Sequence, residues 1–327
     1  MKRNYSIIIP VKTINAYIRE TVAAIQQLQH SQWELLIIPN VDEPNEWLND
    51  KRITVIASGR VGPAAKRDQG AQIATGDILV FLDDDSYPQS NLLTIADKYF
   101  IDANVVALGG PGITPLTDSF WQRVSGAVFL SRFTGGAPER YISQGNVRAV
   151  DDWPSVNLMV RRDVFLAIGG FDCNYWPGED TKLCLKLKAT GKQLLYVPEM
   201  IVWHHRRAGL RAHLKQIGAY GLHRGYFARH YPETSCRPHY FAPSLLVGLV
   251  LLSSVSCWFA SKYQVMCILG WILYGLVLLL GFFGTIRNES FRVAVAAMFY
   301  VPLTHLYYGV RFIQGFFKND ELCSKLR

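Results

Sequence analysis

The sequence has few charged side chains and no closely spaced cysteine pair. Charged residues make up 18% of its 327 residues and hydrophobic residues 50%, which is apolar for a soluble protein. The six cysteines form no CxxC pair, so neither a zinc framework nor a disulfide scaffold is expected. Internal repeats and low-complexity tracts are also absent. No long apolar leader precedes the first strand pattern, so we expect the chain to start in the cytosol.

The net charge of +8 comes from 34 Lys and Arg against 26 Asp and Glu. A nucleic acid partner would explain basic charge, but no surface pattern of alternating basic and aromatic residues supports one. Six Lys and Arg instead fall between Trp203 and Pro232, where no acid offsets them. We therefore expect no nucleic acid partner.

The composition changes sharply near Tyr240. Residues 241–260 and 265–286 carry no charge, and each run meets the roughly 20 residues that cross a bilayer. Four residues separate these two spans, so they should form a helical hairpin. A third apolar segment, 293–317, is interrupted by Pro302, His305 and Arg311, and it either spans the membrane or lies in its interface.

The positive-inside rule predicts the orientation of this membrane region, residues 241–327. The basic stretch precedes the first span, Arg287 and Arg292 follow the second, and the loop between the spans carries only Lys262. Residues 1–240 should therefore face the cytoplasm. The sequence predicts a multi-pass protein of the cytoplasmic (inner) membrane.

Residues 1–240 alternate between strand and helix patterns. Short β-branched runs predict strands at Tyr5–Val11, Trp33–Ile38, Ile53–Ala57 and Asp77–Leu82, with helices at Asn15–Leu28 and Ala64–Thr75. This order indicates an α/β fold with a parallel sheet covered on both faces. In such sheets ligands bind outside the carboxyl ends of the strands.

Three consecutive carboxylates, Asp83, Asp84 and Asp85, follow the fourth predicted strand. An extended backbone puts Asp83 and Asp85 on the same side, where their charges repel unless a cation lies between them. Oxygen ligands suit Mg²⁺ or Mn²⁺, which proteins often share with substrate phosphates. The alternative is a solvated acidic turn that caps the next helix.

Several blocks in a fixed order carry a resemblance to a known family. They are Ser6–Val11, Gly62–Asp68, Gly76–Ile78, Asp83–Asp85, Asn157–Arg162, Gly169–Asp172 and Gly178–Asp180. Together they resemble family 2 glycosyltransferases of the GT-A fold. The resemblance implies a GT-A nucleotide-sugar-binding fold with a mostly parallel sheet in residues 1–240, followed here by a C-terminal transmembrane helical region.

The resemblance also implies the roles of the acidic residues. In that family the triplet is the Asp-x-Asp motif, so Asp85, with Asp83, would hold Mn²⁺ or Mg²⁺ against the donor diphosphate. Asp83 and Asp84 would also contact the nucleotide-sugar. Asp180 would be the catalytic base, with Glu179 beside it. The alternative for this last pair is a favourable interaction with a helix dipole.

Two further residues follow from a Val-x-His-x-x-Arg pattern in some family members. His204 would complete the metal shell, and Arg207 would meet the leaving diphosphate. The alternative is a basic patch that faces anionic lipid.

The remaining candidates line the donor and acceptor sides. Donor contacts would come from Pro10, Val11, Lys66 and Arg67, and from Asn40 or Asp42 at the nucleotide base, although a solvated helix face would equally explain Lys66 and Arg67. Acceptor contacts would come from Asn157, Gly170, Phe171 and Trp176, although residues 170–172 also read as a plain turn.

The sequence therefore predicts an inverting, metal-dependent hexosyltransferase. It would move a sugar from a nucleotide-sugar, with UDP favoured and dTDP or GDP possible, to a lipid-linked glycan or glycolipid for cell-surface polysaccharide. A processive synthase is the nearest alternative, but it normally needs more spans. A non-catalytic sugar-binding module should have lost its carboxylates, and a haloacid-dehalogenase phosphatase would carry its acidic pair after the first strand.

Overall fold

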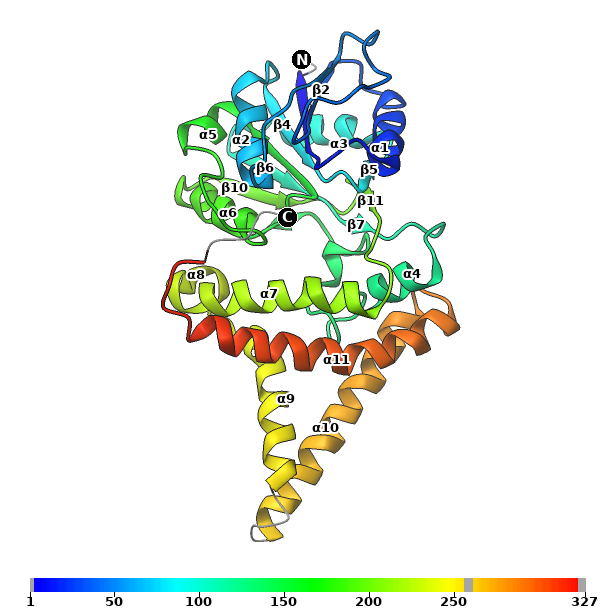
Figure 1. Cartoon of the computed structure of the whole chain (residues 1–327), viewed down its shortest axis with the longest axis vertical. Helices are drawn as coiled ribbons and strands as arrows, with labels where there is room; N and C mark the ends of the chain where they lie inside the picture. Colours follow the sequence, from blue (N-terminus) through cyan, green and yellow to red (C-terminus); the bar gives the residue numbers. More distant parts are fainter. Residues whose placement is uncertain (1–2, 256–260, 323–327) are drawn as a thin grey trace. The chain divides into compact units, whose positions relative to one another are not determined.

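The computed structural model describes residues 3–255 and 261–322, which fold as two compact units (Figure 1). The first unit contains the described residues up to Ile113 together with Ile142–His205. The second contains Thr114–Tyr141 and Arg206–Leu322. The second unit therefore contains residues 114–141 and 206–240, which precede the predicted boundary at residue 240, together with the apolar helices. That residues 1–240 form the transferase domain remains a prediction.

The first unit is an α/β structure. Its strands are β1 (Tyr5–Pro10), β2 (Trp33–Ile38), β3 (Ile53–Val55), β4 (Ile78–Leu82), β5 (Ser86–Pro88), β6 (Val105–Gly109), β7 (Gly112–Ile113), β8 (Arg148–Ala149), β9 (Asn157–Arg161), β10 (Gln193–Tyr196) and β11 (Val202–His204). Its helices are α1 (Ala16–Gln26), α2 (Pro63–Ile73), α3 (Leu92–Tyr99), α5 (Arg162–Ala167) and α6 (Glu179–Ala189). All four strands predicted above are present within two residues of their expected bounds.

Eight strands form the central sheet in the order β3-β2-β1-β4-β9-β6-β10-β8. The pairs β3–β2, β2–β1, β1–β4 and β6–β10 are parallel, while β9 runs antiparallel between β4 and β6. A second sheet has the order β5-β11-β7. The mostly parallel sheet of a GT-A fold is therefore confirmed.

Side chains alternate between the two faces of the sheet, as a strand requires. In β1, Ile7 and Ile9 pack with residues of α1 and α3, whereas Ile8 packs with residues of α2 and α6. Both faces are thus covered by helices, which explains why the strands are almost continuously apolar.

The second unit is helical. It contains α4 (Phe120–Ala127), the short 3₁₀ helix η1 (Pro138–Arg140), α7 (Leu210–His230), α8 (Pro232–Ser235), α9 (Pro238–Val255), α10 (Ser261–Ile286) and α11 (Phe291–Phe316). Figure 1 shows α9 and α10 as a hairpin, with α7 and α11 side by side across its open end.

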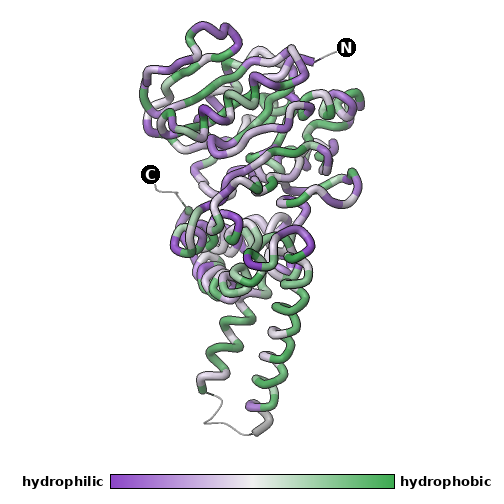
Figure 2. Tube along the Cα trace, turned by 90° about the vertical axis from the view of Figure 1, so that its right-hand side faces the viewer, coloured by the Kyte–Doolittle hydropathy of each residue, from purple (hydrophilic) through white to green (hydrophobic). Residues whose placement is uncertain are grey.

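Among the described residues, three helices are long and apolar enough to cross a membrane: α9, α10 from Tyr263, and α11. Figure 2 shows the hydrophobic character along α9 and α10. Among the described side chains of α9, only Leu246 is buried. The three segments correspond to the predicted runs, except that residues 256–260 of the first run lie outside the described residues.

Candidate active site

The acidic triplet lies where β4 ends, at the carboxyl edge of the central sheet. A tight turn follows, in which the Ser86 hydroxyl donates to the Asp83 carbonyl at 2.9 Å and accepts from the Asp83 amide at 3.1 Å. Ser86 then opens β5, which pairs with β11 so that Ser86 stands opposite His204. This pairing places His204 beside the triplet, although more than a hundred residues separate them in the sequence.

Asp83, Asp85 and His204 form a cluster that could hold a metal ion, with one ligand atom of each within 4.8 Å of the others. His204 Nε2 lies 3.2 Å from Asp85 Oδ1, and Asp85 is only 6% exposed. Two carboxylates and an imidazole are donors that suit Mn²⁺ well, and the carboxylates suit Mg²⁺. The residues present therefore fit a divalent cation, and the sequence predicted all three.

Arg67 connects this cluster to the second acidic pair. Its guanidinium lies 2.5 Å from Asp83 Oδ1 and 3.1 Å from Glu179 Oε1, and the side chain is 2% exposed. The Cζ atom of Arg67 also lies 5.5 Å from the centre of the Phe171 ring. The sequence suggested a phosphate contact or a solvated helix face for Arg67. Burial excludes the solvated face, and the observed partners are carboxylates.

Glu179 and Asp180 occupy the first turn of α6, where the backbone turns at Gly178 with φ of +114°. The pKa of Glu179 is raised to about 7, chiefly by burial and next by the charge of Asp180, while the charge of Arg67 opposes the rise. The side chain of Glu179 points to Arg67, so its placement involves more than the helix dipole. Asp180 Oδ1 accepts a bond from the Thr181 amide at 2.8 Å.

Lys66 is buried at the ends of β1 and β2. Its ammonium donates to the carbonyls of Val11 and Ile38 at 2.5 and 3.1 Å and to Asn40 Oδ1 at 2.7 Å. Burial lowers its pKa to about 8, although Asp84 opposes the change. The solvated-face alternative therefore fails here too.

The other predicted donor contacts belong to the same strand ends. Pro10 ends β1, Val11 follows it, and Asn40 lies just beyond β2, whereas Asp42 is exposed. Lys66 thus ties Val11 to Asn40. Contact of these residues with a nucleotide remains a prediction.

The predicted acceptor-side residues have mixed surroundings. Gly170 has φ of +62°, and the Phe171 amide beyond it donates to Asp68 Oδ1 at 2.8 Å. Asp68 belongs to α2, so this hydrogen bond fixes the turn to that helix. Phe171 is fully buried. Asn157 is also fully buried, and its amide donates to the Met200 carbonyl at 2.7 Å, which supports the backbone. Trp176 is half-buried.

Two contacts near the triplet were not anticipated. Asn15 caps α1 and also donates from Nδ2 to Asp84 Oδ2 at 3.3 Å. His205 Nε2 lies 2.9 Å from Glu20 Oε2. The only signal was Asn15 itself, a cap residue at the start of the first helical pattern.

Arg207 belongs to the second unit, two residues after His205 closes the first. Its side chain is exposed. Its contact with a leaving diphosphate remains a prediction.

Comparison with known proteins decides the family. Residues 6–218 match the model described as Glycosyl transferase family 2. The chain belongs to glycosyltransferase family 2. It is a glycosyltransferase with the GT-A fold, and the matched range includes the Asp-x-Asp cluster and the Glu179–Asp180 pair.

Curated relatives share part of the chain. A pre-mycofactocin glycosyltransferase of Mycobacterium tuberculosis is 29% identical over 192 residues, which cover 59% of this chain and 40% of that protein. A glucosyl-dolichyl phosphate glucuronosyltransferase of Haloferax volcanii is 27% identical over 154 residues, which cover 44% of this chain and 47% of that protein. The chain thus spans less than half the length of these relatives.

A solved structure shares the fold. The mannosyltransferase PcManGT from Pyrobaculum calidifontis, in complex with GDP-Man and Mn²⁺, superposes with a TM-score of 0.64 at 15% identity. The match covers 98% of this chain and 89% of that chain, so the similarity in fold extends beyond the first unit.

Proposed function

We propose that this glycosyltransferase moves one sugar, with inversion, from a nucleotide-sugar to a membrane-associated acceptor such as a lipid-linked glycan or glycolipid. The observation that carries the proposal is the pairing of two acidic groups through Arg67. One group, at Asp83 and Asp85, suits a cation, and the other offers the carboxylate of Asp180 as a base. Inverting transfer needs both kinds of group at one site.

The reaction would proceed by direct displacement. The acceptor hydroxyl oxygen forms a bond to the anomeric carbon while the bond from that carbon to the diphosphate oxygen breaks. Asp180 takes the proton of the hydroxyl as this occurs. A divalent cation held by Asp83, Asp85 and His204 would neutralise the charge of the leaving diphosphate.

The buried residues around these groups would keep them in position. Arg67 fixes Asp83 through its ion pair and holds Glu179 beside Asp180. Lys66 fixes Asn40 at the strand ends, where the nucleotide base would bind. Arg207 would meet the diphosphate from the basic stretch that follows His205.

A membrane acceptor is supported by the three membrane-length helices. Support also comes from the Haloferax relative, whose name specifies a dolichyl phosphate-linked sugar. We propose a cytoplasmic-membrane location with the transferase domain in the cytoplasm, in cell-surface polysaccharide synthesis. The described residues contain three membrane-length helices, fewer than a processive synthase normally needs, which favours a single transfer. The carboxylates of Asp83, Asp85 and Asp180 argue against a non-catalytic module.

The test uses the full chain, purified in detergent and supplied with membrane lipid extract. A panel of UDP-, GDP- and dTDP-sugars is screened for acceptor-dependent release of nucleoside diphosphate, with Mn²⁺, with Mg²⁺ and with EDTA. The product's anomeric configuration is then read by NMR. We expect release from one donor, loss of activity in EDTA and an inverted linkage. A retained linkage, or release that needs no acceptor, would contradict the proposal.

A further inference from the structure

The third apolar helix, α11, is packed along a helix that cannot enter hydrocarbon. Its neighbour α7 contains 21 residues, four of them Lys or Arg, and is not among the described helices apolar enough to span. Arg211, Lys215 and Arg229 of α7 are exposed. A helix of this kind remains in water or in the headgroup region.

Glycines bring the two helices into close contact over several turns. A side chain at Gly218 would meet the ring of Tyr307 at 2.3 Å, and one at Gly225 would meet the Phe312 carbonyl at 2.0 Å. On the other helix, a side chain at Gly315 would meet the Leu222 carbonyl at 2.0 Å. Because the two backbones are this close over several turns, α11 must lie at the same depth relative to the membrane as α7 along this length.

The middle of α11 is also in polar surroundings. The Thr304 hydroxyl lies 2.8 Å from His213 Nε2 of α7, and His305 Nε2 lies 2.9 Å from the Thr134 carbonyl. If α11 spanned a bilayer, these two residues would lie near its centre. Irregular backbone such as that around Thr134 is not tolerated against lipid there.

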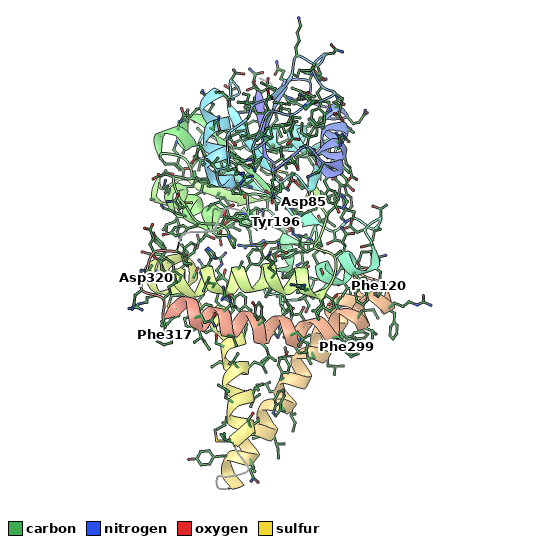
Figure 3. The ribbon with its side chains drawn as sticks, in the orientation of Figure 1. Asp85, Phe120, Tyr196, Phe299, Phe317 and Asp320 are labelled. Carbon is green, nitrogen blue, oxygen red and sulfur yellow. The ribbon has the colours of Figure 1, made fainter. Side chains whose placement is uncertain are left out.

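The side of α11 away from these contacts is apolar and exposed. Phe299, Leu303, Val310 and Phe317 recur at spacings of four and seven residues and are 39–73% exposed. Figure 3 labels Phe317 at the C-terminal end of α11 and Phe299 further along the helix toward its N-terminus. An unpartnered stripe of this kind is typical of a helix that lies in a membrane interface.

The segment that contains α4 extends this surface. Arg123 of α4 pairs with Glu289 in the turn before α11, and the Trp121 ring stacks on Tyr300 at 6.1 Å. Phe120 and Trp121 are nevertheless 42% and 50% exposed. Aromatic residues of this kind favour the headgroup level.

We propose that α11 lies in the interface of a lipid bilayer, with the aromatic end of α4 beside it, and that only α9 and α10 cross. The occupant of the apolar stripe is the bilayer itself, because α9 of the membrane-length hairpin starts beside α11: a side chain at Gly309 would meet the Pro243 carbonyl at 2.4 Å. The other helix of the hairpin, α10, passes α11 at Tyr274, midway along its length, where the Tyr274 hydroxyl lies 3.1 Å from His305 Nδ1. This inference rests on the membrane association proposed above, not on the transfer reaction.

The first test asks on which side the chain ends. Cys236 precedes α9 and Cys323 follows α11, so they are natural reporters for a membrane-impermeant maleimide in sealed vesicles. Variants of the full chain keep one reporter each, or carry Tyr263→Cys in the first turn of α10, at the end of the hairpin where α9 and α10 are joined. In all of them Cys173 and Cys257 are changed to Ser, and the buried Cys184 and Cys267 stay. We expect Cys236 and Cys323 to react on the same side and Tyr263→Cys on the other. Reaction of Cys323 together with Tyr263→Cys would overturn the inference.

The second test measures depth. A fluorophore on Phe299→Cys, Val310→Cys or Phe317→Cys is quenched by lipids brominated near the headgroup or deep in the chains. A spanning helix would separate the first and last of these by about 27 Å at 1.5 Å per residue. We expect equal, shallow quenching at all three.

The matched controls for depth are exposed positions of α10, namely Val265, Ile272 and Leu279, which should give graded depths. Graded depths along α11 as well would overturn the inference. Release of the whole chain by a carbonate wash would overturn both this inference and the proposed membrane location. Transfer activity, assayed in the same vesicles, reports separately on the proposed reaction.

Discussion

The two units of this glycosyltransferase depend on different kinds of contact: buried ion pairs in the first unit and close helix packing at glycines in the second. In the first unit, charged side chains are buried and paired at the carboxyl edge of a sheet: Arg67 joins Asp83 to Glu179. In the second unit, α7 and α11 pack closely because their glycines have no side chain, which leaves room for the atoms of the neighbouring helix.

This difference shows how each unit should respond to mutation. In the first unit, subtracting one charged group should remove chemistry while the strands keep their apolar core. In the second, adding one methyl group should disturb packing without touching the site.

Asp85→Ala should abolish transfer, because the carboxylate that would bind the cation beside the leaving diphosphate is lost. Binding of the nucleoside diphosphate should weaken as well. Calorimetry with and without Mn²⁺, beside the transfer assay, measures both effects. The matched control is Asp163→Ala, which removes an exposed acid of α5 and should leave both values unchanged. Equal nucleotide affinity of the wild-type protein with and without Mn²⁺ would refute the cation's role.

Asp180→Asn should lower the transfer rate by roughly 10²–10⁴-fold, because the amide cannot take the proton of the acceptor hydroxyl. Donor binding should remain, since the predicted donor contacts come from other residues. Single-turnover assays combined with donor titration separate the two steps. The assignment fails if transfer is near normal, or if the variant no longer binds donor.

Arg207→Lys should slow transfer by about tenfold or more in detergent, because a planar guanidinium can bind a diphosphate through two bonds and an ammonium cannot. Arg211→Lys is the control, since both side chains are exposed and only Arg207 is proposed to contact the diphosphate. In detergent there is no anionic bilayer to attract the positive charge of either residue. Equal rates for the two variants would assign the whole basic stretch to membrane adhesion.

Gly225→Ala should destabilise the second unit by about 1–3 kcal/mol, because the new methyl group would lie 2.0 Å from the Phe312 carbonyl and α7 and α11 would have to separate. Gly248→Ala in α9 meets nothing within 4 Å and should be neutral or slightly stabilising. Thermal unfolding in detergent compares the two. A neutral result at Gly225 would show that the contact between α7 and α11 is looser than described.

Most of the first unit's fold could be predicted from sequence because its strands are short apolar runs between helices. A cation site at Asp83 and Asp85 could also be predicted from their place after a buried strand, whereas His204 could be predicted only by resemblance, since a pairing between β5 and β11 brings it to the acids. The antiparallel strand β9 was not predicted as a strand. Its apolar run is only Leu158, Met159 and Val160, flanked by Asn157 and Arg161, and is therefore a weaker strand pattern than the five apolar residues of β4.

The role of buried charges was harder to predict. Lys66 and Arg67 fall on one helix among polar residues, and a helix pattern cannot tell a solvated face from one that covers strand ends. Their partners, at Asn40, Asp83 and Glu179, are distant in sequence. The position of α11 was likewise open, because length and composition describe a helix and not its neighbour. The packing of α11 against the charged helix α7, which only the structure shows, indicates that α11 lies in the interface.

The smallest expected effect concerns the pH dependence of stability. Burial raises the pKa of Glu179 from its ordinary value of 4.5 to about 7, so its carboxyl group holds a proton in the folded state more tightly than in the unfolded state. Its contribution to stability is complete below pH 4.5 and is lost as the pH rises to about 7. The loss should be at most about 1.4 kcal/mol per pH unit. Glu179→Gln stays neutral throughout, so melting temperatures measured in detergent from pH 5 to pH 8 should fall less for this variant than for the wild type. Parallel curves for the two proteins would mean that Arg67 keeps Glu179 ionised in the folded state, and the ion pair would then outweigh burial at this position.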